Sequence, residues 1–116
     1  MTDVSQASSM SLAPGVVDTI ISLTANGVEG VSSIGTPAGG FFARLLKRPT
    51  TSGITTNINA QGKLEITLHI VAKYGYSLTE LADKLRSTIA EALLVQVGVE
   101  VAYIDIYVDS ISFDQA

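Results

Sequence analysis

A change in hydrophobic period between residues 54 and 97 constrains the fold more than any other feature of this chain. From Ile54 to Lys73, apolar and polar residues alternate, which is the period of a strand with one buried face. Gln61-Gly62 interrupts the alternation with residues typical of a tight turn. The segment is therefore predicted to form a β-hairpin, whose buried face would carry Ile54, Ile58, Ala60, Leu64, Ile66, Leu68, Ile70 and Ala72.

The residues after the hairpin follow the period of a helix. Ser77-Leu78-Thr79-Glu80 is a capping box, in which the serine hydroxyl accepts a hydrogen bond from one free N–H and the glutamate reaches back to another. Tyr76 and Leu81 have the spacing of a hydrophobic staple. Apolar residues then recur every three or four positions until Gly98, which predicts a long amphipathic helix.

Weaker patterns flank this central part. Residues 11–26 predict a first helix, with Ser11 as the cap and Pro14 in an early turn, and Gly27 and Gly30 end it. Val31–Ile34 is a candidate short strand. The final strand is predicted from a second alternation, in which Ala102, Ile104, Ile106 and Val108 face inward and Tyr103, Asp105, Tyr107 and Asp109 face outward.

The predicted order of elements is helix, strand, hairpin, helix, strand. Two main helices on one face of a small, mostly antiparallel sheet would bury each apolar face once, which is a two-layer α+β fold. The long helix also permits a parallel crossover to the last strand. A chain of 116 residues fits one domain, predicted here as residues 11–113, with residues 1–10 as a disordered tail.

Composition excludes several classes of function. The chain has no cysteine, which rules out disulfides and thiol chemistry. Residues 1–10 lack the basic start and apolar block of a secretory signal, so we expect a cytoplasmic protein. No apolar run approaches the ~18 residues of a transmembrane segment, so membrane association would be peripheral or through a partner. The net charge of −4 disfavours general binding to nucleic acid.

One basic stretch departs from this acidic background. Arg44, Lys47 and Arg48 lie within five positions, and Pro49 follows them. On a helical wheel the cations oppose an apolar side formed by Phe41, Phe42, Leu45 and Leu46. The leading interpretation is a two-turn helix that packs these apolar residues on its own domain. A membrane or acidic-partner contact through Phe41, Phe42, Arg44, Leu45, Lys47 and Arg48 is the second interpretation, and nucleic acid is the third.

Five segments together resemble the alkaline shock protein family of bacterial cell-envelope and general stress proteins. They are Gly27-Val28-Glu29-Gly30-Val31, Ser52-Gly53-Ile54, Val71-Ala72-Lys73-Tyr74-Gly75, the helix from Leu78, and Val101 to Val108. Each segment alone is common, but their order and spacing match over roughly residues 12 to 112. The chain departs from the family pattern at Thr24-Ala25-Asn26 and at Asp105, where asparagine is frequent in the family.

The resemblance implies a small cytoplasmic α+β domain without enzymatic activity, which self-associates and can be held at the inner membrane surface by a membrane-anchored protein partner. It brings no catalytic, cofactor-binding or metal-binding residues. Because Asp105 makes the outer sheet face more acidic than is usual in the family, the identity of the partner need not carry over.

The candidate interface is the outward face of the last strand. Tyr103, Asp105 and Tyr107 point the same way there, and His69 shares that face if the strands pair suitably, with Asp105 or Asp109 as its neighbour. Tyrosine is rigid, large and amphipathic, which suits a protein interface, and a merely half-exposed sheet is the alternative. A single histidine among exposed carboxylates is weak support for a metal site or a catalytic triad, and a solvated strand histidine is the ordinary interpretation.

The leading functional hypothesis is a stress-associated scaffold or adaptor that assembles with itself and with an envelope-linked protein. The alternative is a KH-like RNA-binding protein that uses the basic patch at 44–48, because Gly27-Val28-Glu29-Gly30 has the GxxG pattern of those domains. Glu29 would repel a phosphate backbone, and a strand is predicted after Gly30 where a KH domain has a helix. An enzyme is the third hypothesis.

Overall fold

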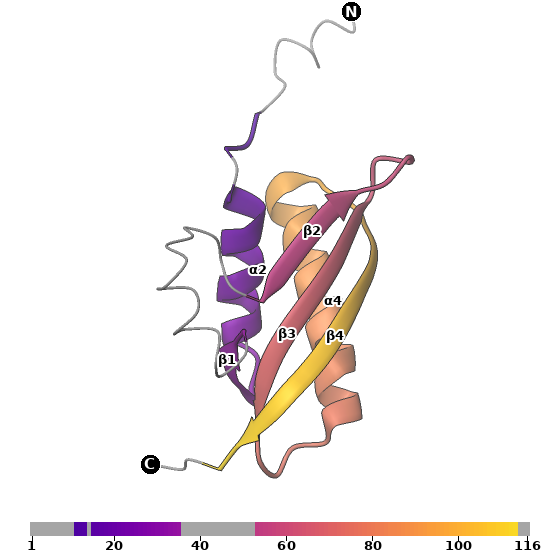
Figure 1. Ribbon diagram of the computed structural model, residues 1–116. Helices are drawn as coiled ribbons and strands as arrows, with labels where there is room; N and C mark the ends of the chain where they lie inside the picture. Colours follow the sequence, from indigo (N-terminus) through magenta and orange to yellow (C-terminus); the bar gives the residue numbers. More distant parts are fainter. Residues whose placement is uncertain (1–10, 14, 36–52, 114–116) are drawn as a thin grey trace, which may run out of the picture.

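Two helices cover one face of a four-stranded sheet (Figure 1). The structure is a computed structural model, which describes residues 11–13, 15–35 and 53–113. This α+β architecture and the order of its elements confirm the prediction. The elements are α2 (Val16–Asn26), β1 (Val31–Ile34), β2 (Ile54–Ile58), β3 (Leu64–Lys73), α4 (Leu78–Val97) and β4 (Val101–Ser112).

Strand β3 is the centre of the sheet. β2 pairs antiparallel with its first half, from Ile58 opposite Leu64 to Ile54 opposite Leu68. β1 pairs antiparallel with its second half, so that β1 and β2 lie end to end along one edge of β3 (Figure 1). β4 pairs with the other edge and runs parallel to β3. The crossover through α4 thus produces the parallel pair that a helix between two strands permits.

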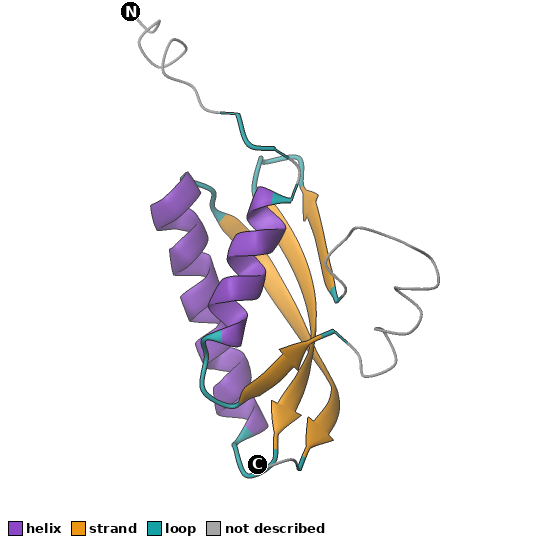
Figure 2. Cartoon of the chain, turned by 90° about the vertical axis from the view of Figure 1, so that its left-hand side faces the viewer, coloured by secondary structure: helices purple, strands orange, loops and turns teal. Residues whose placement is uncertain are grey.

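The core lies between the sheet and the two helices, as Figure 2 shows edge-on. Ile66, Leu68 and Ile70 of β3 are fully buried on this inner face. They meet Ile21 of α2 and the buried stripe of α4, which consists of Leu81, Leu85, Ile89 and Leu93. Full burial of one such side chain contributes roughly 1.5–3 kcal/mol, so this layer is a major source of stability. The alternation on β3 and the helical period after it are confirmed, whereas Ile58 and Ala60 of the predicted buried face are exposed.

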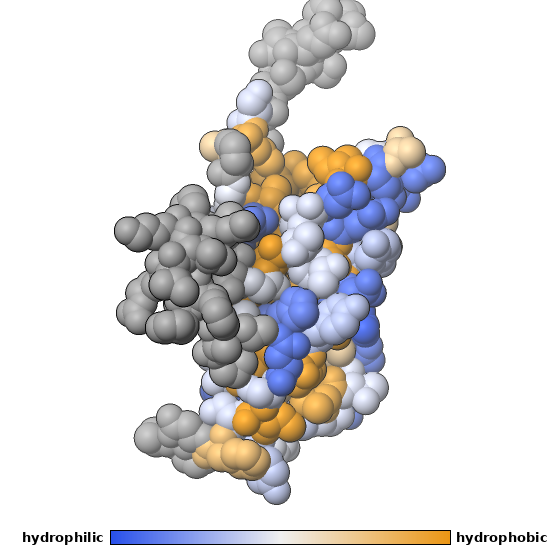
Figure 3. Space-filling view, viewed as in Figure 1, coloured by the Kyte–Doolittle hydropathy of each residue, from blue (hydrophilic) through white to orange (hydrophobic). Residues whose placement is uncertain are grey.

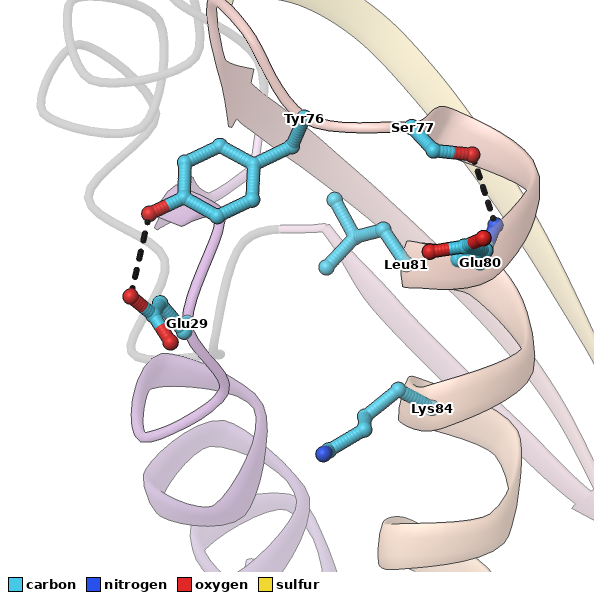
Figure 4. Close-up of a pocket in the computed structure, with 6 residues that line it drawn as sticks. All are labelled: Glu29, Tyr76, Ser77, Glu80, Leu81 and Lys84. Atoms are coloured by element: carbon cyan, nitrogen blue, oxygen red, sulfur yellow. Dashed lines mark hydrogen bonds between the residues drawn. The ribbon is translucent and has the colours of Figure 1, made fainter.

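The ends of α4 are formed by the residues that predicted them. Ser77 Oγ accepts a hydrogen bond from the backbone N–H of Glu80 at 3.3 Å (Figure 4). At the other end Gly98 has a φ of 71°, the left-handed conformation that favours glycine, and its N–H bonds back to the last turn. The helix therefore begins at Leu78 and ends before Gly98, as predicted.

The start of the first helix was predicted wrongly. α2 begins at Val16, and its cap is Gly15, which has a φ of 98° and no side chain that could accept a hydrogen bond. Val16 N–H donates to the carbonyl of Ala13, so a turn precedes the helix. A serine at position 11 therefore lies before this turn and cannot cap the helix.

Three residues that were predicted to be buried are exposed. Ile58 lies opposite Leu64 at the end of β2, but 64% of its surface is in solvent. Ala60 is exposed in the hairpin turn, where the side-chain oxygen of Asn59 accepts from the backbone N–H groups of Gln61 and Lys63. Ala102 is exposed because a bulge interrupts the pairing of β3 and β4: Val101 lies opposite Leu64, and Tyr103 already lies opposite Glu65. One extra residue in β4 thus turns Val101 toward the core in place of Ala102.

Two predicted segments lie outside the described residues. They are the tail at residues 1–10 and the basic stretch from Phe41 to Arg48. Within the described ranges, neither helix is long and apolar enough to cross a membrane.

Candidate interaction surface

The outer face of the sheet is the face that points away from both helices. Its side chains form rows across β2, β3 and β4. Asn57 of β2, Glu65 of β3 and Tyr103 of β4 occupy one row. Thr55, Thr67 and Asp105 occupy the next. Asn57 Nδ2 donates to Glu65 Oε1 at 3.2 Å. We call this surface, with His69, Tyr107 and Asp109, the outer face.

His69 and Tyr107 form the third row, in the middle of the sheet. They lie opposite each other on β3 and β4, and their rings stack with centroids 4.8 Å apart and planes 13° apart. His69 Nδ1 lies 2.8 Å from Asp109 Oδ2. Asp105 and Asp109 were the two carboxylates expected near the histidine, and Asp109 is the one that contacts it. Asp109 is the extra residue of a second bulge, between Val108 and Ser110.

Both tyrosines of β4 leave about half of their surface in solvent, 48% for Tyr103 and 52% for Tyr107. Glu65, directly opposite Tyr103, raises the pKa of its hydroxyl, and partial desolvation and Asp105 add to the shift. The hydroxyl therefore stays protonated beside two carboxylates and is available as a hydrogen-bond donor. The structure thus brings together the predicted residues Tyr103, Asp105, Tyr107 and His69 on one surface.

An aromatic pair at the end of the sheet was not predicted. Tyr74, just after β3, lies 5.1 Å between ring centroids from Phe113, just after β4. The parallel pairing of β3 and β4 places the carboxyl ends of the two strands side by side. The sequence permitted this parallel crossover, and from it the proximity of Tyr74 and Phe113 could have been predicted. In Figure 3 the middle of the outer face is blue and pale, and orange surface gathers where β3 and β4 end. Val71, the apolar exception on this face, is buried.

A second feature lies where α2 leads into β1. The Tyr76 hydroxyl donates to Glu29 Oε2 at 3.2 Å, beside a hollow of about 240 Å³ that Ser77, Glu80, Leu81 and Lys84 also line (Figure 4). Partial desolvation, followed by Glu29, raises the pKa of Tyr76. A Cβ on Gly30 would lie 3.1 Å from the Tyr76 ring, so this glycine packs under the tyrosine.

This packing bears on the GxxG pattern. The backbone of Gly30 faces an aromatic ring, and β1 follows it as a strand, which confirms the predicted strand. Glu29, the acidic residue of the pattern, is engaged by Tyr76. The four residues thus form the connection between the end of α2 at Asn26 and the start of β1 at Val31.

The outer face combines carboxylates, hydroxyl groups and aromatic rings. Among the described residues, no three His, Asp or Glu side chains converge as metal ligands would. His69 has a carboxylate and an aromatic ring as neighbours, an arrangement that orients the imidazole. The predicted contact residues Phe41, Phe42, Arg44, Leu45, Lys47 and Arg48 lie outside the described residues.

Comparison with known families gives one assignment. The sequence model of the alkaline shock protein family, which is described as having a cell envelope-related function, matches residues 2–113 of this chain. Searches among curated proteins and among solved structures found no match. The family match spans both helices and every described strand. The chain therefore belongs to the alkaline shock protein family, whose function is related to the cell envelope.

Proposed function

We propose that this protein is a non-catalytic scaffold of the bacterial envelope and general stress response, which self-associates through the outer face. The observation that carries the proposal is the pair of half-exposed tyrosines, Tyr103 and Tyr107, on a sheet face that lies opposite both helices. Large aromatic side chains with a polar end are enriched at protein interfaces, because they bury much area and lose little conformational entropy. Membership of an envelope-related family supports the cellular role.

The outer face also has the electrostatic character of a recognition surface. Glu65, Asp105 and Asp109 place three carboxylates around the two tyrosines. Such a face repels nucleic-acid phosphates and favours partners with donors or cations. The acidic surroundings therefore support a protein partner over RNA.

The experiment replaces both tyrosines with serine and measures self-association by sedimentation velocity over a range of concentrations. We expect Tyr103→Ser/Tyr107→Ser to lower the association constant at least tenfold, because large aromatic residues dominate interface energies. Leu23→Ser/Val95→Ser is the matched control, since these helix-side residues are 69% and 73% exposed and lie away from the outer face. Equal association of the wild-type protein and the tyrosine variant would refute the role of this face.

We place the protein at the cytoplasmic side of the inner membrane, held there by a membrane-anchored partner. The basic stretch at 44–48 supplies the alternative, a direct contact with anionic lipid. Sedimentation with anionic vesicles separates the two, using the wild-type protein and a variant with Arg44, Lys47 and Arg48 changed to glutamine. Vesicle binding that disappears in the variant would establish direct contact and contradict placement through a partner alone.

A further inference from the structure

The free edge of β4 offers a second copy of the chain a place to pair. β4 lies at the margin of the sheet (Figure 1), and β3 is the one described strand that pairs with it. β4 is also the longest described strand, from Val101 to Ser112. An edge of this length presents backbone N–H and C=O groups that can template another strand.

One contact from α4 shows which backbone groups point outward. Arg86 Nε donates to the carbonyl of Ile104 at 3.2 Å, and Arg86 Nη1 contacts Asp83 Oδ1 at 3.0 Å. In a parallel ladder, successive residues direct their backbone groups alternately to the two sides. Leu64 N–H donates to the Glu100 carbonyl next to β4, whereas the N–H and carbonyl of His69 bond to Gly53 and Gly35 at the opposite edge of β3. Ile66 therefore bonds toward β4, to the residues that flank its partner Ile104, and the groups of Ile104, Ile106 and Val108 point away from β3.

Bulges limit the regular part of this edge. The pairing register shifts between Val101 and Tyr103 and again between Val108 and Ser110. Between these shifts, Tyr103 to Val108 continue without interruption. A partner strand therefore has a short regular segment to pair with, which allows a reversible contact and disfavours open-ended aggregation.

Charge and the length of the uninterrupted segment together select the register. A twofold axis perpendicular to the sheet pairs two β4 strands antiparallel and keeps both outer faces on the same side. With the axis at residue 105, Asp105 would face its own copy, and with the axis at residue 107, Asp105 would face Asp109 of the second copy. With the axis at Ile104, Asp105 would face Tyr103, but only residues 103 to 105 of the uninterrupted segment would pair with one another. With the axis at Ile106, each Asp105 faces a Tyr107 hydroxyl, Ile104 faces Val108, and residues 104 to 108 all pair.

We infer that β4 pairs antiparallel with β4 of a second copy, in the register that places Ile106 opposite its own copy. This inference rests on the proposed self-association and specifies its geometry. The two outer faces then form one continuous surface, on which carboxylates and tyrosine hydroxyls alternate across the joint. The half-buried aliphatic residues Ile106 and Val108 gain cover on the inner side. Arg86 uses one lone pair of the Ile104 carbonyl, and a strand N–H can use the other.

Disulfide trapping tests the register directly, because the chain contains no cysteine. Asp105→Cys and Tyr107→Cys are made separately in the full chain and oxidised alone and as an equimolar mixture. In the inferred register, residue 105 of one copy faces residue 107 of the other with Cα atoms about 4.5 Å apart, within disulfide range. Mass spectrometry then separates the mixed dimer from the two homodimers.

We expect the mixed dimer to exceed each homodimer severalfold, whereas random collision would give only about twice the amount of each. Homodimers that form as readily as the mixed dimer would overturn the register. Absence of any disulfide-linked dimer, with the wild-type protein still self-associating by sedimentation, would overturn edge pairing and leave the proposed function standing. A wild-type protein that stays monomeric would overturn both.

A charge variant provides an independent test. Tyr107→Asp places a carboxylate opposite Asp105 of the second copy, twice in each dimer by symmetry. We expect its dimer dissociation constant to exceed that of Tyr107→Asn by about tenfold at low salt, with the difference shrinking at high salt. Gln96→Glu adds one carboxylate at an exposed position of α4, away from the outer face and from β4, and it should leave association within about twofold. Equal association of Tyr107→Asp and Tyr107→Asn would contradict the pairing.

Discussion

The two faces of the sheet differ although they are built from the same strands. On β3, Ile66, Leu68 and Ile70 are fully buried under the helices, while Thr67 and His69 between them face outward in a polar surface. The inner face holds buried apolar side chains, and the outer face holds side-chain hydrogen bonds and half-exposed tyrosines. The comparison teaches that the apolar core lies on the inner face alone, so substitutions on the outer face should affect stability less.

The largest effect is expected from a cavity on the inner face. Ile66→Ala should lower the free energy of unfolding by about 2–5 kcal/mol, because it removes a fully buried side chain between β3 and the helices. Thr67→Ala, the neighbouring residue on the outer face, should cost less than about 1 kcal/mol. Urea denaturation of both variants measures the difference. Equal losses of unfolding free energy in the two variants would contradict the claim that the inner face contributes more to stability than the outer face.

The next effect compares two glycines with positive φ. Gly30 has a φ of 104° and lies under Tyr76, whereas Gly62 has a φ of 80° in the hairpin turn with open space around it. Gly62→Ala should destabilise by roughly 1–2 kcal/mol through backbone strain alone. Gly30→Ala should cost more, since its Cβ would also lie 3.2 Å from Leu81 Cδ1. Thermal unfolding measures the destabilisation of each variant. A larger destabilisation in Gly62→Ala than in Gly30→Ala would show that Tyr76 and Leu81 leave room for a Cβ at position 30.

The smallest effect concerns the ionisation of Tyr103. Glu65 raises the pKa of this hydroxyl, so Glu65→Gln should lower that pKa toward its ordinary value of 10.0. Because the raised pKa favours the protonated folded state, its contribution to stability is fully present below pH 10.0 and is lost as the pH rises through the folded-state pKa. Glu65→Gln should diminish this loss.

The titration can be followed by tyrosine NMR signals, with Thr67→Ala as a control that leaves both partners in place. An unchanged Tyr103 titration in Glu65→Gln would show that the carboxylate opposite it is too well solvated to act.

The sequence predicted those parts of the fold that depend on local signals. Ser77 and Gly98 mark the two ends of α4. Both ends were predictable because capping and left-handed termination involve only neighbouring residues. The alternation on β3 identified its buried face for the same reason. Ser11 failed as a cap because the left-handed conformation of Gly15 starts the helix later, and a serine pattern contains no information about that turn.

The candidate surface was predictable in its residues but less so in its contacts. Alternation placed Tyr103 and Tyr107 on one face, and the structure agrees. The bulges at Ala102 and Asp109 depend on how two distant strands pair, so the burial of Val101 and the choice of Asp109 by His69 could not be read from one strand. The contact between Tyr76 and Glu29 joins residues far apart in sequence and was likewise out of reach.

Amide hydrogen exchange at low and high protein concentration tests the central claim most directly, namely that the copies meet at β4 and the outer face. We predict that concentration adds protection in peptides spanning Tyr103 to Val108, where outward N–H groups gain partners, and leaves the α2 and α4 peptides unchanged. Added protection confined to the helices, or none at β4 in a protein that sedimentation shows to be associated, would contradict the account.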